Sequence, residues 1–232
     1  DDTILVSIMH VNNEIGTIQP IEDISTIVKE HSKDIYMHVD GIQSFGKLKL
    51  YPREQGIDIL TFSGHKIHAP KGIGGIYADQ GIILHPIIYG GGQEKGLRSG
   101  TENLPGIIGL AEAVGMVAPY VAEDINPMYK LKRMLAEGIV NEVSDATVNG
   151  PKILEGAPHI LSMSFPGIRA EIILHALEER GIYVSTGSAC SSRRNTVSHV
   201  LDAIDISKAE AEGAIRFSLS YMNTEDEVKR VP

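Results

Sequence analysis

The chain has 232 residues, 42% of them hydrophobic, with 21 basic and 30 acidic side chains and a formal net charge of −9. This is enough for a folded protein with a sizeable core, in one large domain or two small ones. The sequence has no concentrated basic face, which argues against a nucleic-acid binder. We find no apolar stretch long enough to span a bilayer and no cleavable signal segment, so we expect a cytoplasmic protein.

Strand-like and helix-like segments alternate in the first half of the chain. Short apolar runs bounded by Gly, Pro or polar residues indicate strands at 4–9, 35–40, 57–63 and 72–78. The segment 21–33 keeps its isoleucines at helical spacing. The alternation predicts an α/β layer with a largely parallel sheet, whose functional residues lie at the carboxyl ends of the strands.

The pattern becomes helical between residues 102 and 143, with Pro119 and Pro127 as interruptions. We therefore place a boundary near residue 120, between a domain at 1–119 and another at 120–232. In the second, HILSMSF, YVST and AIRFSLS are strand-like, while RAEIILHALEERG and TVSHVLDAI are helical. This order predicts a small α+β domain.

Both ends of the chain look abrupt. It opens directly on the apolar run at 4–9, and it stops just after a helix-start signal at 223–226. We expect further residues at both ends.

A polar cluster follows the predicted strand at 57–63, in the segment TFSGHKIHAPKGIGG. Lys66, held in that position, can be partly desolvated and available as an amine nucleophile or Schiff-base former. Ser63 and His65 beside it can hold an anionic group such as a phosphate. The plain alternative is a surface lysine in a turn, which is the more frequent outcome for such a segment alone.

Asp40 closes another predicted strand, in HVDGIQS at 38–44. A carboxylate at a buried strand end is costly to leave unpaired, so we expect a cationic or protonated partner. In pyridoxal enzymes that partner is the ring nitrogen, and a helix cap or salt bridge is the alternative. A metal site is not expected, because His65 and His68 are three residues apart in a loop and do not match the HExxH spacing.

The segment STGSACSSRRN at 185–195 holds Cys190, the single cysteine. One cysteine cannot form an internal disulfide, which agrees with a reducing compartment. Small and hydroxyl residues predict a mobile loop, and the two arginines that follow favour a reactive thiolate, although a lone cysteine is more often inert. Arg216, inside the strand-like AIRFSLS, suits either a substrate carboxylate or a structural ion pair.

Six segments together resemble one family: SIMHVNNEIG, HVDGIQSFGK, FSGHKIHAPKGIG, GGGQEKGLRSGTEN, STGSACSS and IRFSLS. They are similar, in order and approximate spacing, to the C-terminal portion of the NifS/IscS-like cysteine desulfurases of the class V aminotransferase family. The resemblance covers essentially the whole chain, and the SGSAC loop resembles the subgroup with a long flexible cysteine loop. It implies a fold-type-I pyridoxal 5'-phosphate (PLP) enzyme working as a homodimer. The range 1–119 would be the C-terminal part of the large PLP-binding domain, followed at 120–232 by the small domain with the cysteine loop.

The resemblance also implies a role for each matching residue. Lys66 would form the Schiff base with PLP and move a proton, and Cys190 would take the sulfur of L-cysteine as a persulfide, leaving L-alanine. The sulfur would pass to an acceptor protein for iron-sulfur cluster assembly or tRNA thiolation, without direct contact to nucleic acid or membrane. The other implied contacts are Asp40 with the pyridinium nitrogen, Gln43 with the ring oxygen, Ser63 and His65 with the phosphate, Thr101 with the partner subunit's phosphate, and Asn13 and Arg216 with the substrate carboxylate.

Two departures from the family pattern stand out. The upstream Gly/Thr phosphate loop and the histidine that stacks on the cofactor ring are not found in this sequence, and Ser220 stands where a glycine usually follows the IRFSL strand. The alternatives within enzymes are a selenocysteine lyase or another class V PLP aminotransferase, neither of which needs Cys190. A non-catalytic sulfur-relay fragment is the alternative from a different class.

Overall fold

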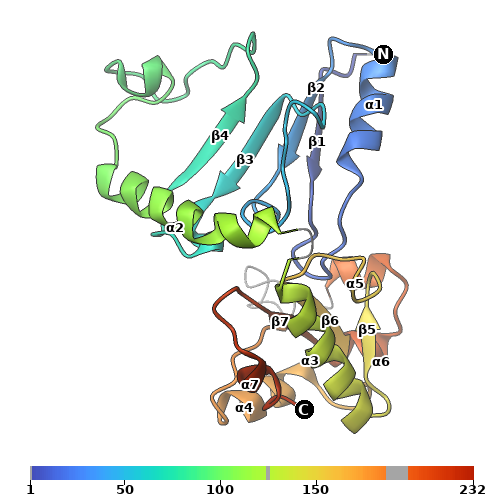
Figure 1. Ribbon diagram of the computed structural model, residues 1–232. Coiled ribbons are helices and arrows are strands. Elements are labelled where there is room, and N and C mark those ends of the chain that lie inside the picture. The colour runs from blue at the N-terminus through green and yellow to red at the C-terminus, as the bar shows by residue number, and fades with distance from the viewer. Residues whose placement is uncertain (1, 124–125, 187–197) are drawn as a thin grey trace. The chain divides into compact units, whose positions relative to one another are not determined.

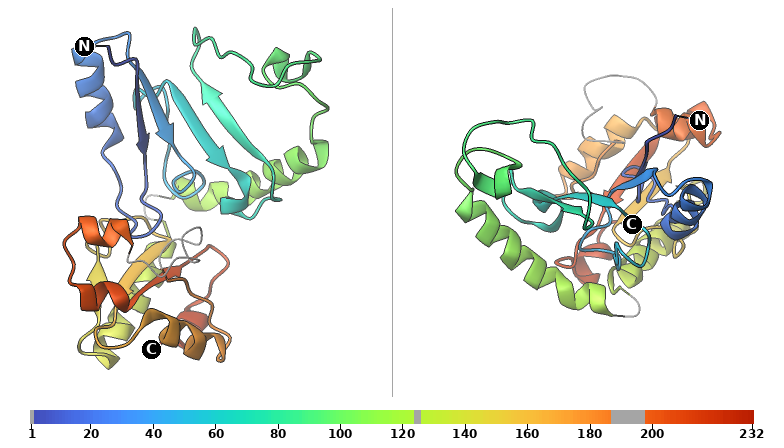
Figure 2. Two further views of the ribbon diagram at one scale, coloured as in Figure 1. Left: turned by 180° about the vertical axis from the view of Figure 1, so that it is seen from behind. Right: turned by 90° about the horizontal axis from the view of Figure 1, so that it is seen from above.

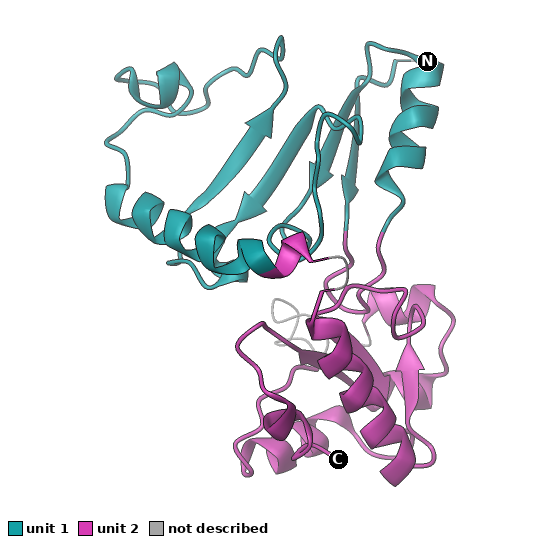
Figure 3. Ribbon diagram, in the orientation of Figure 1, with its two compact units in different colours: residues 1–10, 19–119 teal, residues 11–18, 120–232 magenta. Residues whose placement is uncertain are grey.

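The computed structural model describes residues 2–123, 126–186 and 198–232, and the chain divides into two compact units (Figure 3). The first unit comprises Asp1–His10 and Gln19–Pro119, and the second comprises Val11–Ile18 and Tyr120–Pro232. The segment Val11–Ile18 thus packs with the second unit although it lies inside the range 1–119. The expected assignment of the two domains to cofactor binding and to the cysteine loop stays a prediction.

A four-stranded sheet forms the centre of the first unit (Figure 1). Its strands are β1 (Leu5–Met9), β2 (Tyr36–Asp40), β3 (Ile59–Ser63) and β4 (Gly74–Ala78), hydrogen-bonded in that order. The pairs β1–β2 and β2–β3 are parallel, and β3–β4 is antiparallel. Only residues 64–73 join β3 to β4, too few for the crossover that a parallel neighbour needs. The predicted α/β layer with a mainly parallel sheet is confirmed.

Helix α1 (Ile21–His31) packs on this sheet through its first two isoleucines. Ile21 and Ile24 lie against Met37 and Val39 of β2, which are fully buried. Acidic residues in its first turn and basic residues in its last turn match the helix dipole. The helical spacing of the isoleucines therefore predicted the helix, although Ile27 is 65% exposed and lies outside the buried face.

The glycines that precede and begin β4 let this strand approach β3 closely. A Cβ at Gly75 would come within 2.4 Å of the ring of Phe62, which stacks on Phe45 with centroids 4.0 Å apart. A side chain at Gly75 would therefore displace the ring pair beneath the sheet. This close packing holds the end of β3, and the polar cluster that follows it, in place.

Helix α2 (Leu104–Ala122) contains Pro119 in its last turn. The expectation that Pro119 interrupts the helix is therefore wrong, whereas Pro127 does stand directly before α3 (Met128–Glu142). By length and apolar composition alone α2 could cross a membrane, with 17% of its most apolar stretch buried, so the expectation of no such segment is also wrong. Core helices of water-soluble proteins meet the same criteria, and the finding carries no further conclusion. Figures 1 and 2 show the segment between β4 and α2 drawn out beyond the edge of the sheet.

An antiparallel sheet of three strands forms the core of the second unit, in the order β5 (Thr147–Asn149), β6 (Ile160–Ser164) and β7 (Ala214–Ser218). Every residue of β6 is buried, and Leu161 and Met163 pack with residues of α3 such as Leu135. The remaining helices are short: α4 (Ala170–Glu178), α5 (His199–Ala203), α6 (Lys208–Glu212) and α7 (Glu225–Val228). This is the predicted small α+β arrangement.

Two local expectations in the second unit have different outcomes. The predicted strand YVST is wrong, because Ser185 forms only an isolated bridge with Arg216. The helix start at 223–226 is confirmed: Thr224 caps α7, and its side chain and that of Glu227 satisfy each other's backbone N–H groups.

Ser220, in the place of the usual glycine, closes a turn whose Met222 N–H donates to the Ser220 hydroxyl at 3.1 Å. The backbone there has no positive φ, so the serine fits.

Candidate active site

The ends of three neighbouring strands lie side by side in the first unit. The backbone N–H of His10, just after β1, donates to the carbonyl of Asp40 at 3.0 Å, and that of Gly41 donates to the carbonyl of Thr61 at 2.8 Å. Asp40 closes β2, and Ser63 closes β3 two residues beyond Thr61. The structure therefore brings together the two polar clusters that the sequence placed at separate strand ends.

Asp40 is half-buried and has one side-chain hydrogen bond among the described residues. Its Oδ1 accepts from the backbone N–H of Ile42 at 2.9 Å, and no ion pair to a described residue is found. The expected cationic partner is thus not supplied by the described part of this chain. One carboxylate oxygen remains available to a protonated group from outside.

Gln43 lies buried in the tight turn that follows β2. In that turn the N–H of Phe45 donates to the carbonyl of Gly41 at 2.8 Å, and the N–H of Lys47 donates to the carbonyl of Ser44 at 3.0 Å. These short-range hydrogen bonds give the turn a fixed shape. Gln43, three residues after Asp40, is therefore held at the same end of β2.

A single turn of 3-10 helix, Gly64–Ile67, carries the candidate lysine. Before it, the hydroxyl of Ser63 lies 2.7 Å from Nδ1 of His65, so these two polar groups are paired. The turn ends at His68, which has a left-handed backbone conformation with φ of 67°. Gly64 fits tightly, because a Cβ there would lie 2.9 Å from the Cβ of Ala69.

The amine of Lys66 has no hydrogen bond and no ion pair with any residue that the structure describes, although the side chain is half-buried. Its backbone carbonyl accepts a hydrogen bond of 2.7 Å from Nζ of Lys47. Burial, together with the charge of Lys66, lowers the pKa of Lys47 to about 8. Sequence reasoning missed Lys47, even though it is the last residue of the HVDGIQSFGK segment.

Thr101 lies exposed at the end of the drawn-out segment before α2. That segment is closed on itself: the N–H of Gly91 donates to the hydroxyl of Ser99 at 2.7 Å, and Nη1 of Arg98 donates to the carbonyl of Gly100 at 2.8 Å. No hydrogen bond links the Thr101 side chain to a described residue. The structure thus leaves its predicted reach to a partner subunit untested.

Arg216 and Asn13, 203 residues apart, meet in the second unit, where Nη1 of Arg216 donates to the carbonyl of Asn13 at 2.9 Å. Burial lowers the pKa of Arg216, and the charge of Glu14 opposes this effect. Nε of Arg216 is buried and has no hydrogen-bond partner among the described residues. An unpaired guanidinium N–H in a buried position suits a carboxylate ligand.

Glu14 is a second residue that sequence reasoning missed. It is 4% exposed, and its Oε2 accepts a hydrogen bond of 2.5 Å from the hydroxyl of Ser198, which also caps α5. Its position one residue after Asn13, in the same motif, was the available signal. Cys190, the predicted nucleophile, lies outside the described residues.

The residues of the first unit fit the chemistry of PLP. Asp40 offers an unpaired carboxylate oxygen, which a protonated pyridine nitrogen requires, and Lys66 offers an unpaired amine for an aldehyde. The hydroxyl of Ser63 and the ring of His65 are the kinds of group that hold phosphate oxygens. In the described part of the chain, no cluster of three or more His, Asp or Glu side chains could hold a metal ion.

Comparison with known proteins places this geometry in a family. The family model for aminotransferase class-V matches residues 1–231. The protein named cysteine desulfurase IscS from Dictyoglomus turgidum is 42% identical over 98% of this chain and 57% of its own length. A solved structure of a NifS-like protein has 43% identity and a TM-score of 0.88, covering 100% of this chain and 60% of the other. A solved structure of SspA in complex with cysteine has 39% identity and a TM-score of 0.75, covering 94% and 61%.

The chain spans about three fifths of the length of the relatives it matches. Our expectation that this is their C-terminal portion stays a prediction. The family match, in contrast, extends over all but the last residue, and the fold agrees with that of the NifS-like structure. This chain therefore belongs to the class-V aminotransferase family.

Proposed function

We propose that the full-length protein is a PLP-dependent cysteine desulfurase, which converts L-cysteine to L-alanine and leaves the sulfur on Cys190 as a persulfide. The observation that carries the proposal is the placement of Asp40 and Lys66 at the ends of adjacent parallel strands, where one carboxylate oxygen of Asp40 and the amine of Lys66 have no partner among the described residues. Relatives at about 40% identity carry the name cysteine desulfurase, which supports the same activity.

The cofactor proposed for this site is PLP, a general property of the class-V aminotransferases. Lys66 would hold it covalently, Asp40 would keep its ring nitrogen protonated, and Gln43 would donate to its ring oxygen. Ser63 and His65 would hold its phosphate, and Thr101 would reach the phosphate bound by the second subunit of a homodimer. When bound, PLP supplies an electron sink that stabilises negative charge at the substrate α-carbon.

The chain's own residues would carry the other steps. Arg216, with its buried unpaired Nε, would bind the substrate carboxylate beside Asn13. Lys66 would take the α-proton and later return it. The Cys190 thiolate would attack the substrate sulfur, and the electron pair of the broken carbon-sulfur bond would stay with the substrate carbon. Cysteine and an enzyme thiol thus become alanine and an enzyme persulfide, with no external oxidant or reductant.

Substrate and partners follow from the same chemistry. The related SspA structure contains cysteine, which supports L-cysteine as the substrate here. The enzyme can turn over again only after another thiol has removed the sulfur from the Cys190 persulfide. We therefore propose a sulfur-acceptor protein as partner, either an iron-sulfur scaffold or a tRNA-thiolation enzyme. We place the enzyme in the cytoplasm.

Two variants of the full-length protein test the proposal. Lys66→Ala should lose the visible absorbance of bound PLP and all alanine release, since Lys66 is the lysine that the motif match assigns to the link. Cys190→Ser should still bind PLP and cysteine, but alanine production should stop, because a hydroxyl is a far weaker nucleophile toward sulfur than a thiolate. Mass spectrometry of the wild type with cysteine should find about 32 Da added to the Cys190 peptide, the mass of one sulfur atom.

Three outcomes would contradict the proposal. A borohydride-trapped PLP adduct on Lys71 in the wild type would show that the lysine is wrongly assigned. Alanine production by Cys190→Ser at the wild-type rate would favour a selenocysteine lyase or another class V aminotransferase. Absence of any visible PLP absorbance in the full-length protein would favour a non-catalytic sulfur relay.

A further inference from the structure

Glu14 is a buried carboxylate beside the arginine proposed to bind the substrate. The residue is 4% exposed, and its side chain accepts a hydrogen bond of 2.5 Å from the hydroxyl of Ser198. Nη1 of Arg216 donates at 2.9 Å to the carbonyl of Asn13, in the peptide group that joins Asn13 to Glu14. Removing a charged group from water is costly unless an opposite charge lies nearby, so Glu14 and Arg216 each offset the cost of burying the other.

The turn that carries Glu14 has a fixed backbone. Oδ1 of Asn12 accepts hydrogen bonds from the N–H groups of Glu14 at 2.8 Å and of Ile15 at 3.0 Å. The N–H of Gly16 donates to the carbonyl of Asn12 at 3.0 Å, and Gly16 has φ of 74°, a conformation that favours glycine. A Cβ at Gly16 would lie 3.2 Å from Cβ of Ile160 in β6, so the turn packs closely against the second sheet. The backbone of Glu14 is therefore held in place by its own segment.

Two different neighbours act on the guanidinium of Arg216. The carbonyl of Asn13 orients it through a hydrogen bond, whereas no hydrogen bond joins it to the side chain of Glu14 in the described part of the chain. Burial lowers the pKa of Arg216, and the charge of Glu14 acts in the opposite direction. Glu14 thus favours the charged guanidinium without occupying its buried Nε, which no described residue satisfies and which suits a carboxylate ligand.

We propose that Glu14 is the counter-ion of Arg216: it balances the guanidinium charge when no substrate carboxylate is bound, and it weakens the binding of that carboxylate. A second anion beside the same guanidinium is repelled by the first, so Glu14 lowers the affinity of the site for L-cysteine. The product L-alanine carries the same carboxylate, and its release is eased in the same way. The inference rests on the proposed function, because that function assigns the substrate carboxylate to Arg216.

The test compares the unfolding of the cofactor-free, full-length protein in urea with and without 3-mercaptopropionate, which has the thiol and carboxylate of cysteine but no amine. A ligand raises the unfolding midpoint according to its concentration relative to its dissociation constant, so a titration gives that constant. Glu14→Gln keeps an oxygen that can accept from Ser198 and removes the charge. We expect the dissociation constant of 3-mercaptopropionate to fall about fivefold or more, because exposed charge pairs already reach this factor. Cysteamine, which lacks the carboxylate, should gain no affinity from the substitution at the same ionic strength.

A double-mutant cycle with Arg216→Gln supplies a second readout that needs no ligand. Glu14→Gln should lower the urea midpoint of the otherwise wild-type protein, because it leaves the guanidinium without its counter-ion. In the Arg216→Gln background the same substitution should not lower the midpoint, since no cation then remains to be balanced. Should Glu14→Gln alone fail to fold, the double variant should still fold, and failure of both would overturn the inference in favour of a purely structural Glu14.

Ser198→Ala is the matched control. It removes the hydroxyl that caps α5 and contacts Glu14, but it keeps the charge of Glu14. We expect a loss of stability of the kind that a lost helix cap gives, with an unchanged dissociation constant for 3-mercaptopropionate. A purely structural role of Glu14 would produce this same pattern in Glu14→Gln.

Two results would overturn the inference alone: an unchanged or raised dissociation constant of 3-mercaptopropionate in Glu14→Gln, or the same loss of stability for Glu14→Gln with and without Arg216. Equal binding of 3-mercaptopropionate to the wild type and to Arg216→Gln would overturn it together with the assignment of the carboxylate to Arg216. These measurements use neither PLP nor turnover. The desulfurase proposal is therefore judged separately, by PLP trapping and alanine release.

Discussion

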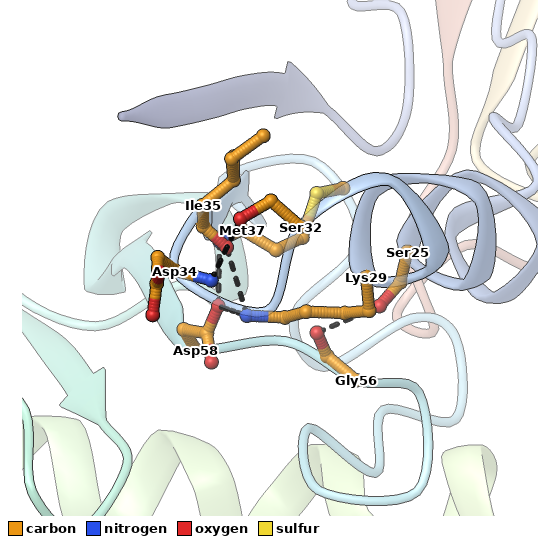
Figure 4. A network of polar contacts seen from close by, with 8 residues as sticks. All are labelled: Ser25, Lys29, Ser32, Asp34, Ile35, Met37, Gly56 and Asp58. Atoms are coloured by element: carbon orange, nitrogen blue, oxygen red, sulfur yellow. Dashed lines mark hydrogen bonds and ion pairs between the residues drawn. The ribbon is translucent and has the colours of Figure 1, made fainter. Parts of the chain in front are cut away.

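Asp58 links helix α1 to strand β2 at the start of β3 (Figure 4). Its Oδ2 accepts hydrogen bonds of 2.6 Å from Nζ of Lys29 and of 2.6 Å from the backbone N–H of Met37. Lys29 also donates to the carbonyl of Ile35 at 2.9 Å. Because β2 and β3 end in Asp40 and Ser63, this network holds the far ends of the two strands that carry the candidate cofactor site. We predict that Asp58→Ala markedly destabilises the fold.

The size of the effect follows from the contacts. A hydrogen bond to a charged group contributes about 1.5 to 3 kcal/mol, and Asp58→Ala removes two, leaving the N–H of buried Met37 without its acceptor. The side chains of Lys29 and Asp58 are 29% and 20% exposed, so water recovers part of the loss. We expect the free energy of unfolding to fall by about 3 kcal/mol, and by about half of that for Asp58→Asn, which keeps an oxygen acceptor.

The assay is urea unfolding of the cofactor-free, full-length protein, followed by circular dichroism and analysed with a common m value. Arg53→Met is the matched control, because Nε of Arg53 pairs with Asp79 at 3.3 Å with both side chains well exposed, at 67% and 39%. It should leave the free energy of unfolding unchanged within the error of the measurement. An Asp58→Ala variant as stable as the Arg53→Met variant would refute the reasoning that partial burial gives this network its strength.

Two further predictions concern single charges. Asp40→Asn should leave the fold intact and slow turnover by about a hundredfold or more, because an amide does not keep the PLP ring nitrogen protonated; near-normal alanine release would make Asp40 purely structural. Burial lowers the pKa of Lys132 in the folded state to about 8, from the ordinary 10.5. Between these pH values the unfolded chain binds more protons than the folded one, so the free energy of unfolding should rise with pH across that window. Lys132→Met should lose a rise on the order of 1 to 2 kcal/mol between about pH 7 and 9.5, and an identical pH profile in both proteins would exclude the buried charge as its cause.

The strand ends that carry Asp40 and Lys66 could be predicted because an apolar run followed by polar residues is a local signal. The path of the chain between elements was harder. Pro119 looked like a helix end, yet α2 continues through it to Ala122, and a proline this close to the helix terminus removes only one N–H donor from the last turn. YVST has strand-forming residues, but only Ser185 pairs with β7. Propensity without a neighbouring strand does not make a strand.

Lys47 and Glu14 could not be assigned from the sequence, because what distinguishes them is tertiary. Lys47 donates to a backbone carbonyl 19 residues away, and Glu14 accepts from Ser198, 184 residues away. A hydrogen bond to a backbone carbonyl places no constraint on the side chain of the accepting residue, so no pattern in the sequence predicts such a contact. Both residues lie inside motifs in which other residues were singled out from the sequence. Their hydrogen bonds contact neighbouring parts of the fold, which a motif alone does not reveal.

The candidate residues divide between the two units in a way that motif order conceals. Asp40, Gln43 and Lys66 belong to the first unit, while Asn13 belongs to the second, although it precedes all of them in the chain. The reason is that the segment Val11–Ile18 leaves the first sheet after β1, with Val11 and Ile18 bridged to each other. The carbonyl of Gly16, within this segment, accepts a hydrogen bond of 2.8 Å from the N–H of Ala157. If Arg216 and Asn13 bind the substrate carboxylate as proposed, a cysteine analogue that lacks the carboxylate should lose catalysis as well as affinity, because its α-carbon would no longer be held in place.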